Sequence, residues 1–128
     1  MLYSQDLLIT KETTRKAPMR VTFRVTQGTI RRVWVRWRWG SANLCGARML
    51  YHEFQYWPHA IGQWFPSTTH DLVFSSEVEL RNEPFEIALE GYNEDDTYPH
   101  RVWVAFEIHR EVIPRALAAF FDYFARRE

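Results

Sequence analysis

Alternation of apolar and polar residues dominates this chain and predicts β-strands. In residues 20–26 and again in 29–39 the apolar residues occupy every second position: Val21, Phe23 and Val25, then Val33, Val35, Trp37 and Trp39. Strict period-two patterning is typical of a half-buried strand. Because Gln27-Gly28 favours a turn between the two segments, we expect them to pair as an antiparallel hairpin.

Further segments continue the pattern. After a loop expected from Gly40 to Gly46, residues 47–57 are apolar and aromatic, and we expect Met49, Tyr51 and Phe54 to face inward. Residues 72–80, 85–89 and 102–108 alternate as well, and they predict three more strands. Prolines and a glycine at 58–69 predict an irregular loop, and residues 91–100 are polar.

The C-terminal segment has a different period. Its apolar residues recur at the spacing of an amphipathic helix: Ile113, Leu117, Phe120, Phe121 and Phe124. Pro114 suits the first turn of such a helix. The patterns together predict an all-β domain at residues 1–110, a single antiparallel β-sandwich of jelly-roll or immunoglobulin-like topology, followed by a C-terminal amphipathic helix at 111–128. This helix could cover its own sheet or dock on a neighbouring subunit.

The composition narrows the class of protein. A chain of 128 residues suits one domain, and its aromatic content of 16% favours β structure. Cys45 is the single cysteine, which excludes an internal disulfide framework. No segment is long and apolar enough to cross a bilayer, and the N-terminus lacks a signal-peptide pattern. We therefore expect no membrane partner, and a location in a virion or in the cytoplasm.

Charge is balanced in total but segregated along the chain. Sixteen basic and sixteen acidic residues give a net charge of zero, which makes nucleic acid an unexpected partner. Nine basic and no acidic residues lie in 13–52, whereas ten acidic residues and one basic residue lie in 53–100. Basic strands could pair with acidic strands across a sheet. Alternatively, faces of opposite sign could meet between neighbouring copies.

Candidate chemistry is sparse. The five histidines lack the spacing of a structural zinc site, and Cys45 suits a small packed residue better than a nucleophile. The acidic run Glu94-Asp95-Asp96 offers oxygen ligands of the kind that calcium prefers, but it lacks the EF-hand spacing and fits a solvated turn better. We therefore predict no enzyme, no metal site and no cofactor.

Aromatic residues in three places predict an interface instead. Trp57, Trp64 and Phe65 lie in or beside the 58–69 loop, which presents more aromatic surface than a small domain readily buries. Trp34 alternates with arginines, among them Arg36 and Arg38, on the strand face opposite the apolar stripe. The third place is the apolar face of the C-terminal helix: Leu117, Phe120, Phe121 and Phe124.

Three stretches carry a resemblance to known proteins. They are residues 28–35, residues 63–66, and residues 84–87 together with 92–96 and 98–100. In these stretches the chain resembles small β-sandwich proteins found among the structural components of phages and viruses, over about Leu8 to Ile108. The resemblance implies a structural role and assigns no catalytic or binding residue.

Two functional hypotheses follow. The first is a non-enzymatic structural subunit of a virion, a capsid or another shell or filament, which forms homo-oligomers or joins other structural subunits. The alternative is a carbohydrate- or ligand-binding module in which Trp57, Trp64 and Tyr98 stack on the ligand, with a calcium ion near Asp95 and Asp96. A small hydrolase or isomerase would need a catalytic constellation that the sequence does not offer.

Overall fold

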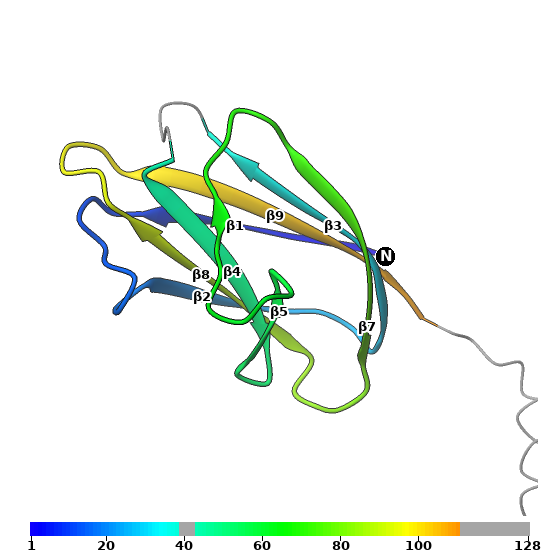
Figure 1. Ribbon diagram of the computed structural model, residues 1–128. Coiled ribbons are helices and arrows are strands. Elements are labelled where there is room, and N and C mark those ends of the chain that lie inside the picture. The colour runs from blue at the N-terminus through cyan, green and yellow to red at the C-terminus, as the bar shows by residue number, and fades with distance from the viewer. Residues whose placement is uncertain (39–42, 111–128) are drawn as a thin grey trace, which may run out of the picture.

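The computed structural model describes residues 1–38 and 43–110, and this part of the chain forms nine β-strands in two antiparallel sheets (Figure 1). The strands are β1 (Leu2–Ile9), β2 (Met19–Arg24), β3 (Gly28–Trp37), β4 (Cys45–Tyr51), β5 (Phe54–Trp57), β6 (Phe65–Pro66), β7 (Leu72–Leu80), β8 (Glu86–Asn93) and β9 (His100–His109). The expectation of an all-β domain built from antiparallel sheets is confirmed over these residues.

The strand order is nested. Sheet A has the order β1-β9-β3-β7, and sheet B has the order β2-β8-β4-β5, with the short β6 also beside β4. The first strand therefore pairs with the last, β2 pairs with β8, β3 with β7, and β4 with β5 and β6. As a result, the first four strands alternate between the two sheets.

The two sheets enclose one hydrophobic core. Inward residues of the central strands are fully buried, among them Val33 and Val35 of β3. Aromatic rings connect the layers: the Phe106 centroid in sheet A lies 5.0 Å from Trp57 and 6.0 Å from Phe23, both of sheet B. The alternation in the sequence thus identified the buried face of β3 correctly.

The predicted hairpin of residues 20–39 is not formed. β2 pairs with β8 in sheet B, whereas β3 pairs with β7 and β9 in sheet A. Gln27-Gly28 therefore carries the chain from one layer to the other. Gly28 has a φ of 152°, and a Cβ at this position would collide with the backbone of His109. Alternation shows which face of a strand is buried, but not which strand is its partner.

Residues 45–57 form two strands where one was expected. β4 and β5 pair as a hairpin around His52-Glu53, and both turn residues have positive φ, at 53° and 61°. Phe54, expected to face inward, is 49% exposed because it follows this reversal directly. Cys45 and Gly46, expected in a loop, belong to β4, and β6 lies within the expected 58–69 loop.

The first strand was missed by the sequence prediction, and the predicted C-terminal helix lies outside the part of the chain that the structure describes. β1 was not predicted, because only its last residues, Leu7 and Ile9, combine alternation with burial. The expected C-terminal helix, with Leu117, Phe120, Phe121 and Phe124, lies outside the described residues, as does Trp39. Within the described ranges, no helix could cross a membrane.

Segregated charges pair across the strands of the same chain. The Arg36 guanidinium lies 2.8 Å from Asp71, and Arg31 lies 3.0 Å from Glu77. Arg48 of β4 lies 2.9 Å from Glu90 of β8. Pairing of the basic first half with the acidic second half is thus confirmed within the chain, while contact between copies stays a prediction.

Candidate functional site

The outer face of sheet A gathers two tryptophans and four arginines from strands far apart in the sequence. We call this surface the Trp–Arg face, and its residues are Trp34, Trp103, Arg32, Arg36, Arg38 and Arg101, with Leu2, Leu8 and Val73. The register of the strands brings these residues to one side of the sheet. One row across the four strands consists of Ser4, Ala105, Trp34 and Val73. Their neighbours along each strand point into the core, so these side chains point outward.

Ion pairs and ring contacts order the centre of this face. Arg36 donates two hydrogen bonds through Nε and Nη2 to the Asp71 carboxylate, and its guanidinium lies 5.2 Å from the Trp103 ring centroid. The hydrogen bond from Arg36 lowers the pKa of Asp71. Arg101 lies 2.9 Å from Asp6 of β1. Arg36 thus contacts a carboxylate and an aromatic ring at the same time.

A hollow of about 220 Å³ lies beside these contacts. It is lined by Asp6 of β1, by Arg36 of β3 and Arg38 just after that strand, and by Arg101 and Trp103 of β9. Arg36 is paired with Asp71 and Arg101 with Asp6, and the additional guanidinium of Arg38 gives the hollow a net positive charge. It is large enough for a small polar group with an edge or ring against Trp103.

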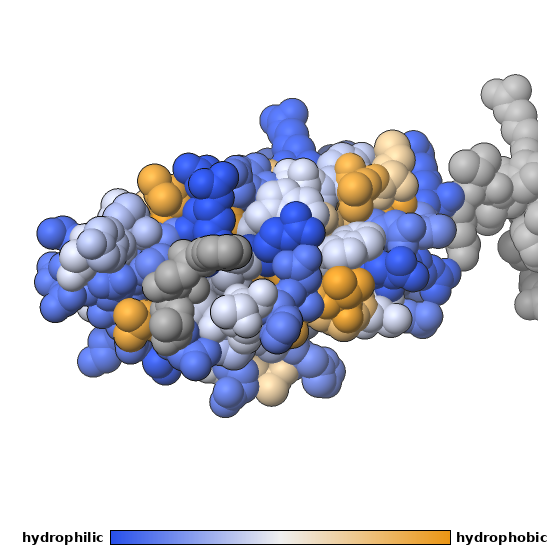
Figure 2. Space-filling view, turned by 90° about the horizontal axis from the view of Figure 1, so that it is seen from above, coloured by the Kyte–Doolittle hydropathy of each residue, from blue (hydrophilic) through white to orange (hydrophobic). Residues whose placement is uncertain are grey.

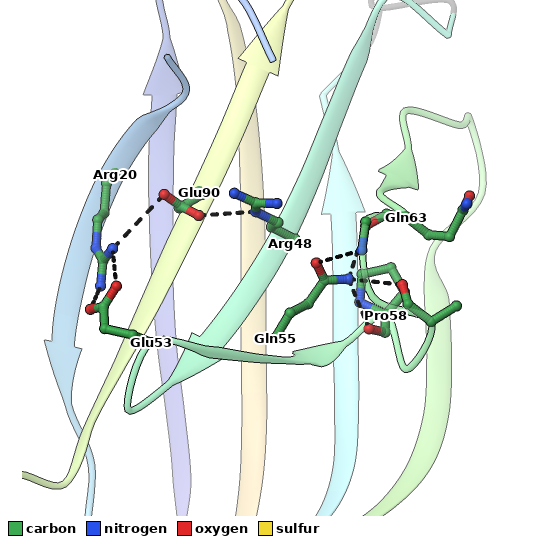
Figure 3. A network of polar contacts seen from close by, with 9 residues as sticks. Arg20, Arg48, Glu53, Gln55, Pro58, Gln63 and Glu90 are labelled. Atoms are coloured by element: carbon green, nitrogen blue, oxygen red, sulfur yellow. Dashed lines mark hydrogen bonds and ion pairs between the residues drawn. The ribbon is translucent and has the colours of Figure 1, made fainter. Parts of the chain in front are cut away.

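The outer face of sheet B is different, because the chain's own loop covers part of it. Gln55 of β5 is 5% exposed and anchors this loop (Figure 3). Its Nε2 lies within hydrogen-bond distance of the carbonyl oxygens of Pro58, Ala60 and Gln63, at 3.0, 3.1 and 3.0 Å. Its Oε1 accepts a bond from the Gly62 amide at 3.3 Å.

Trp64, at the end of this loop, completes the cover. The Trp64 ring meets the Tyr92 ring edge-on at 4.9 Å, and the Arg48 guanidinium lies 4.3 Å from the Trp64 centroid. Gly46 leaves the space for Tyr92, since a Cβ at residue 46 would collide with that ring. As a result, Tyr92 is only 5% exposed although it lies on the outward side of β8.

A row of charges continues from Arg48 across sheet B. Glu90, 8% exposed, lies 2.9 Å from Arg48 and 3.9 Å from Arg20, and Arg20 also pairs with Glu53 (Figure 3). The hydrogen bond from Arg20 lowers the pKa of Glu53. These charges are paired with one another, so this face is occupied by its own contacts.

The predicted interface residues separate into three places. Trp57 is 2% exposed, its Nε1 donates to Ser76 Oγ at 3.1 Å, and it packs in the core, so it presents no surface to a partner or a ligand. Trp64 and Phe65 are partly buried, and Phe65 packs 5.4 Å from Phe74. Trp34, Arg36 and Arg38 do come together, on the Trp–Arg face.

Sequence reasoning missed the other half of that face. Trp103 and Arg101 take the outward positions of β9, just as Trp34 and Arg36 do in β3. The matching alternation of arginine and tryptophan in the two strands was the available signal. Asp6 and Leu2 were missed because β1 itself was not predicted.

The acidic loop between β8 and β9 holds itself together. Asp95 Oδ1 accepts the Thr97 amide at 2.8 Å, and its Oδ2 lies 2.7 Å from His100 Nε2. Glu94 pairs with Arg15 at 2.9 Å. Tyr98, the remaining stacking candidate, is 65% exposed on this loop. Among residues 1–38 and 43–110, no group of three His, Cys, Asp or Glu side chains is placed to hold a metal ion.

Cys45 is enclosed beside the same loop. It is 0% exposed, and its Sγ donates to Asn93 Oδ1 at 3.3 Å. Burial, with a smaller effect of Asp95 and Glu94, raises the pKa of the thiol to about 12. A thiol with this pKa and no access to solvent is a packing residue and not a nucleophile.

Comparisons with known proteins provide no relative. No protein-family model, no curated protein and no solved structure matches this chain.

Proposed function

We propose that this protein is a non-enzymatic structural subunit, a jelly-roll β-sandwich that associates with copies of itself in a virion or a comparable shell or filament. The Trp–Arg face is its contact surface. The observation that carries the proposal is the contrast between the two outer faces. The chain's own loop and ion pairs lie over the outer face of sheet B, where the outward aliphatic residues Leu50 and Ala88 are buried, whereas the outward aliphatic residues Leu2, Leu8 and Val73 stay exposed on sheet A.

The nested strand order supports the jelly-roll assignment. A jelly roll follows from folding one long antiparallel ribbon, in which the first strand pairs with the last and each inner pair lies within the next. β1–β9, β2–β8, β3–β7 and β4–β5 form such a series. In an immunoglobulin-like sandwich the first two strands share a sheet, which β1 and β2 do not. Jelly rolls occur in viral capsid and lectin domains.

The composition of the Trp–Arg face supports a protein partner. Tryptophan and arginine are the residues most enriched in the energetic centres of protein interfaces. The face adds exposed aliphatic side chains, with Leu2 at 63%, Val73 at 53% and Leu8 at 44%. On the side of the molecule seen in Figure 2, hydrophobic residues form separate patches between hydrophilic ones.

Light scattering and sedimentation test the proposal on the full chain. We expect the protein to form a defined oligomer at micromolar concentration. Val73→Asp places a carboxylate on an exposed outward position of β7, and it should weaken association about tenfold or more, because an unpaired charge would be buried in the contact.

Thr22→Asp is the matched control, since Thr22 lies at an exposed outward position of edge strand β2 in sheet B. It should leave the oligomer unchanged. A wild-type chain that stays monomeric at all concentrations overturns the proposal, and so does an oligomer that Val73→Asp does not weaken.

The hollow favours a second candidate function, the binding of a small ligand such as a glycan. Trp103 forms one wall, and three arginines supply donors for hydroxyl or carboxylate oxygens. A glycan panel should then quench tryptophan fluorescence in the wild type but not in Trp103→Ala. Equal quenching of both proteins, or quenching of neither, counts against this function.

A further inference from the structure

The Trp–Arg face spans the whole of sheet A, and nothing among the described residues covers its apolar part. Leu2 of β1, Trp34 of β3 and Val73 of β7 point to the same side of the sheet. Leu50 and Ala88 are the comparable outward aliphatic residues of sheet B, and they are only 8% and 4% exposed. Among the described residues, the outer face of sheet A therefore keeps its aliphatic side chains exposed, whereas those of sheet B are covered.

The same chain contains an apolar stripe outside the described residues. Residues 111–128 follow directly from β9, a central strand of sheet A, and their apolar positions have helical spacing. A helix over residues 113–128, which number 16, would be about 24 Å long. Four strands spaced about 4.8 Å apart are about 15 Å across, so such a helix is long enough to lie over all of them.

The connection to β9 favours a neighbouring copy over the chain's own sheet. β9 ends at His109, beside Gly28 and Leu80 at the end of sheet A, and only three residues separate Arg110 from Pro114. Ile113 precedes a proline, which disfavours helical backbone at that position and favours extended backbone. A short connection of this kind opposes an immediate reversal, and short connections favour the exchange of a terminal element between subunits.

We propose that the apolar stripe of residues 111–128 of one copy docks on the Trp–Arg face of a second copy. This inference rests on the proposed function, because it names the segment through which self-association takes place. Leu117, Phe120 and Phe124 of one copy pack against Trp34, Val73 and Leu2 of the other. The contact is head-to-tail, since one copy contributes the stripe and the next contributes the sheet.

Cross-linking between two chains that each carry one added cysteine tests this contact. Full-length Val73→Cys protein labelled with ¹⁵N is mixed with unlabelled full-length Ala118→Cys protein, and a short bis-maleimide is added. Residue 118 flanks the stripe and leaves it intact, and the buried native Cys45 does not react. We expect a labelled-to-unlabelled cross-link between residues 73 and 118, identified by mass spectrometry.

Thr22→Cys mixed with Ala118→Cys is the control, and its yield should be several-fold lower. Yields equal to this control overturn the inference. A double variant, Val73→Cys with Ala118→Cys, that cross-links only within single chains also overturns it, because the segment then covers its own sheet.

Charge substitutions in the stripe separate this inference from the proposed function. Full-length Phe120→Asp with Phe124→Asp should weaken association about tenfold or more, whereas Asp122→Asn, on the other side of the helical period, should not. If both proteins associate like the wild type, the inference fails while the proposed function stands on the Val73→Asp result. If the wild type is monomeric, both fail.

Discussion

Asn93 shows at the residue scale how one buried side chain joins several segments. It is 0% exposed at the end of β8. Its Nδ2 donates to the carbonyl oxygens of Ile9 and Tyr98, and its Oδ1 accepts from the Asp95 amide and from the Cys45 thiol. All its hydrogen-bonding capacity is used within the protein, and it connects β1, β4 and the β8–β9 loop.

Asn93→Ala should therefore be strongly destabilising. The substitution removes several buried hydrogen bonds, each contributing about 1 kcal/mol, and leaves the carbonyl groups of Ile9 and Tyr98 without this donor. We expect a loss of about 3 kcal/mol or more in the free energy of unfolding, measured by urea denaturation. Asn82→Ala, at an exposed position, is the control, and an equal small effect of both variants would contradict this role.

Asp95 should make the protein less stable at acid pH. The hydrogen bond from His100, together with the Thr97 and Tyr98 amides, lowers the pKa of Asp95 below its usual value of 3.8. The folded state thus binds the proton less well than the unfolded state does. The stabilisation is fully present above the unfolded pKa, and it is lost as the pH falls through the lower folded pKa.

The melting temperature of the wild type should accordingly fall more steeply between pH 5 and pH 2 than that of Asp95→Asn, which cannot titrate. Asp96→Asn, in the same loop, should keep the wild-type slope. Parallel curves for the wild type and Asp95→Asn would show that this carboxylate does not contribute.

The 58–63 loop shows at the element scale how a segment without regular structure becomes a fixed part of the fold. Pro58, Ala60 and Gln63 direct their carbonyl groups at one amide, that of Gln55. The loop thus closes around a side chain from the strand that precedes it. Trp64 is held by the same arrangement over Tyr92.

Gln55→Ala should release this loop. We expect a loss of about 2–3 kcal/mol in the free energy of unfolding and faster proteolytic cleavage within 58–66, because the loop carbonyls lose their common donor. Gln63→Ala is the matched control, since the contact there is made by the backbone and the side chain is exposed. Cleavage at the wild-type rate in Gln55→Ala would refute the anchoring role.

The nested strand order governs folding at the scale of the whole molecule. β1 pairs with β9 along their length, from Leu2 with Glu107 to Ile9 with His100, so the two ends of the described chain must meet. Closing such long loops comes before the contacts that stabilise them. Sheets dominated by pairings of this kind form slowly.

Refolding should accordingly take milliseconds to seconds, the range of all-β domains with non-local pairing. Stopped-flow tryptophan fluorescence measures this, because Trp57 and Trp37 become buried on folding. Refolding in microseconds would contradict the proposed dependence on long-range pairing.

A β1 variant such as Ile9→Ala should lower the free energy of unfolding by about 2–4 kcal/mol, since Ile9 is fully buried.

The sequence predicted much of the fold and only part of the site. Alternation located β3, β7, β8 and β9 and the buried face of each, and it placed Trp34, Arg36 and Arg38 on one outward surface. It did not find β1, whose burial is confined to its last residues. It placed Trp57 in an exposed loop, because its contact with Phe106 comes from a strand nearly fifty residues away.

Local pattern by itself determined which residues of β3, β7 and β9 face the core, because burial of one strand face imposes a period of two whatever the neighbouring strand is. It also determined that basic and acidic segments were available to pair. Only the tertiary structure decided the partners: β2 and β3 in different layers, Trp103 beside Arg36, and a loop over one sheet and not the other. These outcomes depend on contacts between residues far apart in the chain, which no local period specifies.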